Sequence, residues 1–97
     1  MKNLKKVKFK KGTVCYLSKV GMYGYWYPCH EYETVITNDV EAEHMSNWRN
    51  QKPYYAFKVL AGCVKTIGVD LADDQFVCVW FREKQILENM LKIEKGE

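Results

Sequence analysis

Four cysteines and two histidines are the residues of this chain whose types suit nucleophilic or metal chemistry. They are Cys15, Cys29, His30, His44, Cys63 and Cys78. A cysteine nucleophile needs a base within hydrogen-bond reach and a third group that orients the base. Cys29 and His30 are adjacent, and adjacent side chains of an extended segment point to opposite faces. With no phosphate-binding glycine loop and no nucleophile elbow either, the sequence predicts a non-enzymatic protein without catalytic residues.

A metal site is the second chemistry that these residue types allow. Zinc ligands usually come in close pairs such as C-x-x-C, and the sequence has no such pair. Three of the four cysteines lie in apolar, strand-like surroundings, where a free thiol behaves as a small hydrophobic side chain. The spacing therefore predicts core cysteines, no metal and no cofactor, with a metal-dependent fold as the weaker alternative.

The length of 97 residues fits one domain, residues 1–97, with a modest hydrophobic core. A composition of 47% hydrophobic and 28% charged residues is typical of a folded globule. No apolar run approaches the roughly 18 residues that a membrane-spanning helix needs. The start, MKNLKKVKFKK, has the charge of a signal peptide without the apolar segment that should follow. We therefore expect a cytoplasmic chain with free thiols and no membrane partner.

Charge is distributed unevenly along the chain. Six of the fifteen basic residues fall in the first eleven positions, which contain no acid, so the remainder has nine basic and twelve acidic residues. Residues 31–43 hold five acids and neither lysine nor arginine. The sequence therefore has a basic arm and an acidic middle, which is not the pattern of a uniformly basic nucleic-acid binder.

Hydrophobic alternation predicts five strands. The first contains Val7 and Phe9 between lysines, is interrupted by a bend at Gly12 and resumes at 13–17, and the others are 32–37, 54–60, 63–71 and 76–81. Residues 18–31 carry two glycines and a proline, which predicts a long loop or a distorted hairpin. Val40, His44 and Trp48 have helical spacing, so we expect a short helix near 39–48.

Residues 82–95 predict an amphipathic helix. Its apolar stripe consists of Ile86, Leu87, Met90 and Leu91, and charged residues cover the other face. The stripe either covers an open barrel end or forms a dimer contact. Trp80, in the apolar strand, is expected in the core, whereas Trp48 is expected to pin the acidic segment to the sheet.

Three motifs give the chain a resemblance to a known fold. F-K-K-G-T-V-C-Y-L, Y-E-T-V-I-T and F-V-C-V-W-F-R-E-K-Q-I-L-E-N-M-L, with a long first loop, resemble small SH3-like barrel proteins of phages and mobile elements. The resemblance implies a mainly β fold: a five-stranded antiparallel SH3-like barrel, a basic N-terminal strand at 1–11 and a C-terminal amphipathic helix. It also implies an aromatic groove beside the first loop.

The stretch GMYGYWYPCHEYE (21–33) is the strongest candidate for contact with a partner. Tyrosine and tryptophan are the commonest anchors of protein interfaces, and here they gather within a few residues. The predicted contact residues are Tyr23, Tyr25, Trp26 and Tyr27. If the segment is extended, the three tyrosines share one face and Trp26 lies on the other, so one set packs inward.

The acidic run supplies a second predicted contact. Its members are Glu31, Glu33, Glu41 and Glu43. A carboxylate-rich surface can occupy a basic groove on another protein, including one that normally holds nucleic acid. Together with the mobile-element resemblance, this predicts a protein-binding module, with an anti-CRISPR-like inhibitor of a host defence protein as its specific form. A solvated acidic face that aids solubility is the plainer interpretation.

The alternative function is binding of nucleic acid by the basic arm. The residues concerned are Lys5, Lys6, Lys8, Lys10 and Lys11, with the same rings as stacking platforms. Such binding depends on neutralised phosphates and weakens as salt is raised. The neighbouring glutamates would oppose it.

Overall fold

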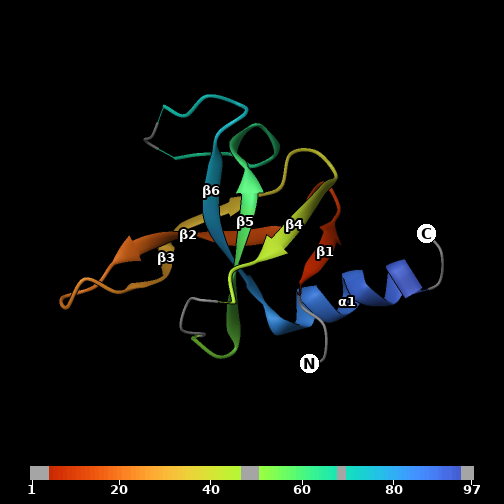
Figure 1. The fold of residues 1–97 in the computed structure, drawn as a ribbon, viewed down its shortest axis with the longest axis horizontal. Coiled ribbons are helices and arrows are strands. Elements are labelled where there is room, and N and C mark those ends of the chain that lie inside the picture. Colours follow the sequence, from red (N-terminus) through yellow and green to blue (C-terminus); the bar gives the residue numbers. More distant parts are fainter. Residues whose placement is uncertain (1–4, 47–50, 68–69, 95–97) are drawn as a thin grey trace.

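Six β-strands form one antiparallel sheet in the order β1-β4-β5-β6-β2-β3, and a helix follows the last strand (Figure 1). The structure, a computed structural model, describes residues 5–46, 51–67 and 70–94, with side chains as far as residue 89. Its elements are β1 (Lys6–Phe9), β2 (Val14–Val20), β3 (Trp26–Val35), β4 (Val40–His44), β5 (Tyr54–Leu60), the 3-10 turn η1 (Ala61–Cys63), β6 (Phe76–Arg82) and α1 (Glu83–Glu94). The predicted mainly β class with a C-terminal helix is confirmed.

The sheet differs from the predicted five-stranded barrel in strand number and in closure. It has six strands, and among the described residues its edge strands β1 and β3 do not pair with each other. Three local differences account for the strand count. The first predicted strand is divided in two, residues 40–44 form a strand where a helix was predicted, and the described residues of 63–71 do not form a strand.

Gly12 divides the first predicted strand. Its φ of +92° lies in the region that favours glycine, and it turns the chain between β1 and β2. The Gly12 amide donates a hydrogen bond to the Ile36 carbonyl (2.8 Å), and the Ile36 amide donates to the Thr13 carbonyl (2.9 Å). The Lys11 amide donates to Asp39 Oδ1 (2.8 Å). These bonds fix a corner from which β1 and β2 continue to different positions in the sheet.

The prediction of a short helix near 39–48 is wrong for residues 40–44, which form β4. Val40 and Ala42 are buried while Glu41 and Glu43 are exposed, the period-two pattern of a strand. The register places lysines of β1 opposite these glutamates, and opposite charges across strands favour the pairing. The helical spacing of Val40, His44 and Trp48 was therefore a weaker signal than this alternation. Trp48 and its predicted pinning role lie outside the described residues.

The predicted strand at 63–71 is also wrong where the chain is described. β5 pairs with β6 along its whole length, from Tyr54 opposite Arg82 to Leu60 opposite Phe76. The place beside β5 that a 63–71 strand would take in a hairpin is therefore occupied. The chain after β5 instead makes the turn η1 and a single bridge between Val64 and Ile36 before it returns to β6.

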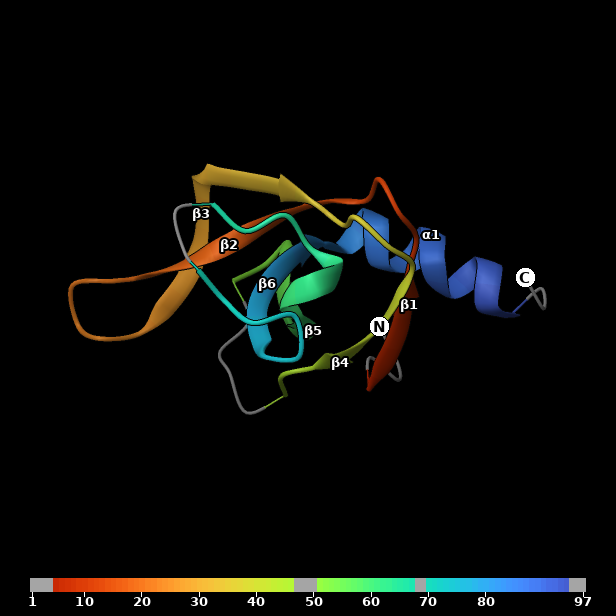
Figure 2. The same cartoon turned by 90° about the horizontal axis from the view of Figure 1, so that it is seen from above.

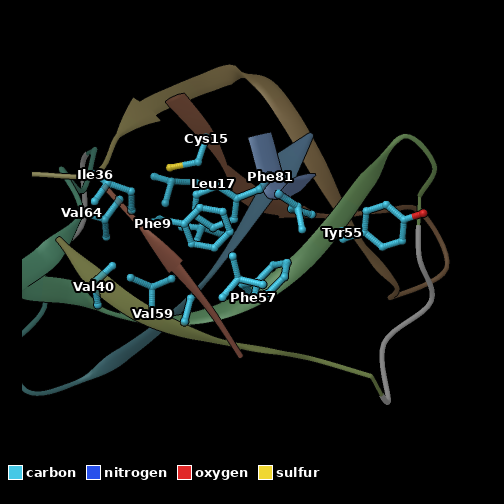
Figure 3. Packing of buried hydrophobic residues seen from close by; sticks show 14 residues of the cluster. Phe9, Cys15, Leu17, Ile36, Val40, Tyr55, Phe57, Val59, Val64 and Phe81 are labelled. Carbon is cyan, nitrogen blue, oxygen red and sulfur yellow. The ribbon is translucent and has the colours of Figure 1, made fainter. Parts of the chain in front are cut away.

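The main core lies within the curve of the sheet, and phenylalanine rings form its centre (Figure 3). Phe9 and Phe81 stack with centroids 3.7 Å apart, and Phe57 meets them edge-on at 5.3 and 5.7 Å. Val7 of β1 and Ile86 of α1 belong to the same cluster. The first strand and the final helix therefore close the core together.

The helix α1 packs against β1 and β6, then runs past β1 and away from the sheet (Figure 2). Ile86 is fully buried, as predicted, whereas Leu87 is 43% exposed and does not belong to the buried stripe. The side chains of Met90 and Leu91 lie outside the described set. No helix in the described part of the chain is long and apolar enough to cross a membrane.

Candidate binding surface

The hairpin formed by β2 and β3 projects from the body of the molecule (Figure 2). Its turn is fixed by two backbone hydrogen bonds, from the Gly21 amide to the Tyr25 carbonyl (2.7 Å) and from the Gly24 amide to the Gly21 carbonyl (3.0 Å). Gly24 has a φ of +80°, which a residue with a Cβ rarely adopts. Met22 and Tyr23 stand at the tip with exposures of 90% and 83%. The stretch 18–31 is thus a hairpin, the second of the two predicted forms.

The four predicted contact rings all lie on this hairpin, but not as the two faces of an extended strand. Tyr23 belongs to the turn, and Tyr25 and Trp26 follow it with exposures of 50% and 44%. Tyr27 is half-buried, and a Cβ added at Gly21 would lie 3.2 Å from Cε1 of its ring. Tyr27 therefore supports the turn, while the other three rings remain accessible.

A bulge in β3 bends the hairpin. Tyr16 lies opposite Glu33 and Ser18 opposite Pro28, so a single residue of β2 faces residues 29–32 of β3. Extra residues on one strand bend it and redirect its side chains, and proline is tolerated at such a position. As a result Trp26, which precedes the bulge, and Tyr32, which lies within it, line the same groove.

The groove has a volume of about 590 Å³ and lies between β3, β6 and the chain that follows η1. Trp26 and Tyr32 line it from β3, Ile67 and Leu71 line it from the connection to β6, and Phe76 stands at the start of β6. The resemblance implied an aromatic groove beside residues 18–31, but sequence reasoning did not name Tyr32, Ile67 or Phe76 as lining residues. The signal was available for Phe76, because strand alternation that buries Val79 and Phe81 places residues 76, 78 and 80 on the other face.

A side-chain network forms the floor of the groove. Trp80 Nε1 donates a hydrogen bond of 2.6 Å to Ser18 Oγ, and the Ser18 hydroxyl lies 3.2 Å from Cys78 Sγ, to which it donates. Burial raises the pKa of the Cys78 thiol to about 11, against a smaller lowering by the Ser18 hydrogen bond. The thiol is therefore neutral at physiological pH. Trp80 is fully buried beneath this floor, as the sequence predicted.

A cluster of rings continues the same face beside the groove. Tyr16, His30 and Tyr54 meet edge-on with centroids 5.0 to 5.6 Å apart. The Tyr16 hydroxyl donates a hydrogen bond to Glu33 Oε1 at 3.2 Å. The pKa of Tyr16 is raised, mainly by burial and to a smaller extent by the Glu33 carboxylate. Arg82 lies 6.0 Å from the centroid of the Tyr54 ring. The pairing of β5, β6, β2 and β3 brings these residues together from distant parts of the sequence.

The acidic run is divided between two places. Glu31 and Glu33 are exposed on β3, whereas Glu41 and Glu43 are exposed on β4, and three strands (β5, β6 and β2) lie between β4 and β3 in the sheet. Lys6 Nζ makes an ion pair with Glu41 Oε1 at 3.5 Å. The residues of 31–43 therefore do not form one acidic surface.

The five lysines of the alternative site are exposed on or next to β1. Lys6 and Lys8 lie opposite Glu43 and Glu41, so carboxylates of β4 lie beside ammonium groups that would contact phosphates. Lys58 of β5 also lies opposite Glu43. This region is a patch of mixed charge, which we call the charged patch (Lys6, Glu41, Glu43, Lys58).

The four cysteines are free. Cys15 and Cys29 are buried and Cys63 and Cys78 are half-buried, and burial raises the pKa of Cys15 to about 12. Within the described ranges no three histidine, cysteine or acidic side chains come close enough together to hold a metal ion. Cys29 and His30 point to different sides of β3, Cys29 inward and His30 outward, as their adjacency predicts.

Comparisons with family models, with curated proteins and with solved structures found no match for this chain.

Proposed function

We propose that this chain is a protein-binding module whose contact surface is formed by the hairpin rings and the groove. This aromatic surface consists of Tyr23, Tyr25, Trp26, Tyr32 and Phe76. The observation that carries the proposal is an apolar groove whose lining includes Trp26, one of the exposed rings of a projecting hairpin. Contiguous exposed rings of this kind are typical of interaction sites, and aromatic anchors in pockets dominate the energy of binding.

The size of the aromatic surface supports a protein partner. With about 200 Å² for a fully exposed ring, its five rings leave roughly 500 Å² accessible. Met22 and Ile67, exposed by 90% and 41%, enlarge this area. A specific protein interface buries about 800 Å² on each partner. The hairpin and the groove together are therefore of the size that one partner would cover.

The inhibitor hypothesis has less support than the general binding function. It rests on an acidic surface, and only Glu31 and Glu33 lie near the aromatic surface, while Glu41 and Glu43 face lysines. We retain an anti-CRISPR-like role as a proposal carried by Glu31 and Glu33 alone. The nucleic-acid alternative has less support as well, because Glu43 and Glu41 lie opposite Lys6 and Lys8 and would repel phosphates.

We also propose that the sheet is related to the SH3-like barrels that the sequence resembles. Two features support the relation: the corner at Gly12 after a short first strand, and a helix that begins directly after the last strand. A determination of the structure in solution would test it, since pairing of the two sheet edges would make the barrel complete.

The function is tested by affinity capture of the tagged chain from bacterial lysate after nuclease treatment, read by mass spectrometry. The variant Tyr23→Ala/Tyr25→Ala removes two exposed rings at the hairpin tip. It should reduce the amount of a stoichiometric partner that is captured at least tenfold. Leu87→Ala is the control, because Leu87 is an exposed hydrophobic residue on α1 that does not belong to the aromatic surface. Capture that is equal for the hairpin variant and the control would refute the proposal. Reversal to lysine at Glu31 and Glu33 tests the inhibitor form separately.

A further inference from the structure

The residues that line the groove carry no charge. They are leucine, serine, tryptophan, tyrosine, threonine, isoleucine, phenylalanine, valine and cysteine, and the raised pKa keeps the Cys78 thiol protonated at physiological pH. Among the lining residues that the structure describes there is therefore no counter-ion for a charged group. Burying an unpaired charge is costly, whereas burying an apolar group is favourable.

The polar groups on the floor of the groove already have partners. The Ser18 hydroxyl accepts a hydrogen bond from Trp80 Nε1 and donates one to Cys78 Sγ. A bound group therefore does not have to satisfy these atoms, and an occupant with its own hydrogen-bond donors would find few acceptors there. The floor therefore favours an apolar occupant, as the uncharged lining does.

Phe76 stands between the groove and the charged patch. The ring lines the groove on one side and lines the patch with Lys6, Glu41, Glu43 and Lys58 on the other. Lys58 Nζ lies 4.4 Å from the centroid of this ring, a cation–π contact. Lys58 lines the patch and not the groove, so the contact with Phe76 holds its ammonium group outside the groove lining, where it would otherwise attract anions.

We infer that the groove takes an uncharged apolar side chain of the partner, aromatic or branched aliphatic, and that Phe76 enforces this choice by shielding the groove from Lys58. This inference rests on the proposed function and describes the chemistry of its partner. A volume of about 590 Å³ lies within the ~300–1,000 Å³ of ligand pockets, so the groove can accept one or two large side chains.

Two fluorescent probes with one skeleton test the selectivity without the partner. N-phenyl-1-naphthylamine is neutral, and 8-anilinonaphthalene-1-sulfonate carries the same rings with a sulfonate. Titration of the full chain should show the neutral probe binding at least tenfold more tightly. Equal affinities, tighter binding of the sulfonate or no binding of the neutral probe would each overturn the inference.

Three variants locate the site and test the role of Phe76. Ile67→Asp places a carboxylate on the groove wall and should lower the affinity for the neutral probe at least tenfold. Leu87→Asp, at a similarly exposed position on α1, should leave this affinity unchanged. Phe76→Ala should lower the preference for the neutral probe several-fold, because it opens the groove to Lys58. Phe76→Leu keeps an apolar side chain and should retain most of the preference. An unchanged preference in Phe76→Ala would overturn the shielding role.

The inference and the proposed function can fail separately. If the hairpin variant Tyr23→Ala/Tyr25→Ala loses the partner but the probes bind alike, the inference is wrong and the function stands. If the neutral probe is selected but the hairpin variant keeps the partner, the selectivity belongs to a groove that the proposed contact does not use, and the function is wrong.

Discussion

The indole nitrogen of Trp80 donates a hydrogen bond to the hydroxyl of Ser18, 2.6 Å away, across two neighbouring strands of the sheet. The bond joins β6 to β2 on the face that carries the groove. It also fixes the hydroxyl that forms part of the groove floor. One contact therefore contributes both to the stability of the sheet and to the shape of the proposed binding site.

Replacement of Ser18 by alanine should destabilise the protein. The indole N–H of Trp80 is fully buried and would lose its acceptor, which costs about 1–3 kcal/mol. Urea denaturation would measure the free energy of unfolding. Ser18→Thr keeps a hydroxyl in a residue suited to strands and should retain most of the stability. Equal stability of Ser18→Ala and the unmodified chain would show that this bond does not form in solution.

Two phenylalanines at opposite extremes of burial should respond differently to truncation. Phe9 is fully buried and stacks on Phe81, so Phe9→Ala should lower the free energy of unfolding by about 3–5 kcal/mol. Phe76 is 56% exposed, and Phe76→Ala should cost about 1 kcal/mol or less. Thermal denaturation of both variants would check the order. A larger loss for Phe76 would contradict the described core.

Stability should fall at alkaline pH because of two buried thiols. Burial raises the pKa of Cys15 from its ordinary 9.0 to about 12 and that of Cys78 to about 11. Between pH 9.0 and these raised pKa values the unfolded chain binds fewer protons than the folded one, so stability decreases as pH rises. Stability from this source is complete below pH 9 and is lost as pH rises through the folded pKa values.

The alkaline effect can be assigned by substitution. Urea midpoints measured from pH 8 to pH 11 should fall less steeply in Cys15→Ala/Cys78→Ala than in the unmodified chain. A smaller slope should remain, because burial also raises the pKa values of Tyr16 and Tyr55. Identical slopes in the two proteins would mean that the thiols are not responsible.

Close packing at Gly62 gives a fourth prediction. A Cβ at this position would lie 2.9 Å from Cβ of Asp73, a distance at which one of the two segments must move. Gly62→Ala should therefore destabilise the turn after β5, with a loss of about 1–3 kcal/mol typical of overpacking. The double variant Gly62→Ala/Asp73→Gly removes the opposing Cβ and should recover part of this loss. Failure to recover any of it would place the strain elsewhere.

Local sequence patterns predicted the elements whose partners are close in the chain. The apolar strand at 76–81, the strand at 54–60 and the helix from residue 82 all appear, because their own periodicity determines which face is buried. The segment at 40–44 was misjudged, since Val40 and His44 fit both helical spacing and alternation. What decides between them is the pairing of Glu41 and Glu43 with lysines of β1, which a local window does not contain.

The candidate site was predicted only in part for the same reason. Composition alone identified Tyr23, Tyr25 and Trp26, because exposed rings on a glycine-rich turn need no distant partner. Most of the lining of the groove was missed, since Tyr32, Ile67 and Phe76 come together only through the bulge in β3 and the return of the chain from η1. Sites made by tertiary contacts leave little trace in the spacing of residues.

The shared packing of β1 and α1 has a consequence for synthesis of the protein. Val7 and Phe9 are among the first core residues to leave the ribosome, and Ile86, which completes the same cluster, is among the last. Until then β1 has an uncovered apolar side, and contacts so distant in sequence form slowly. The nascent chain is therefore most exposed to aggregation and to chaperone binding until its final helix has emerged.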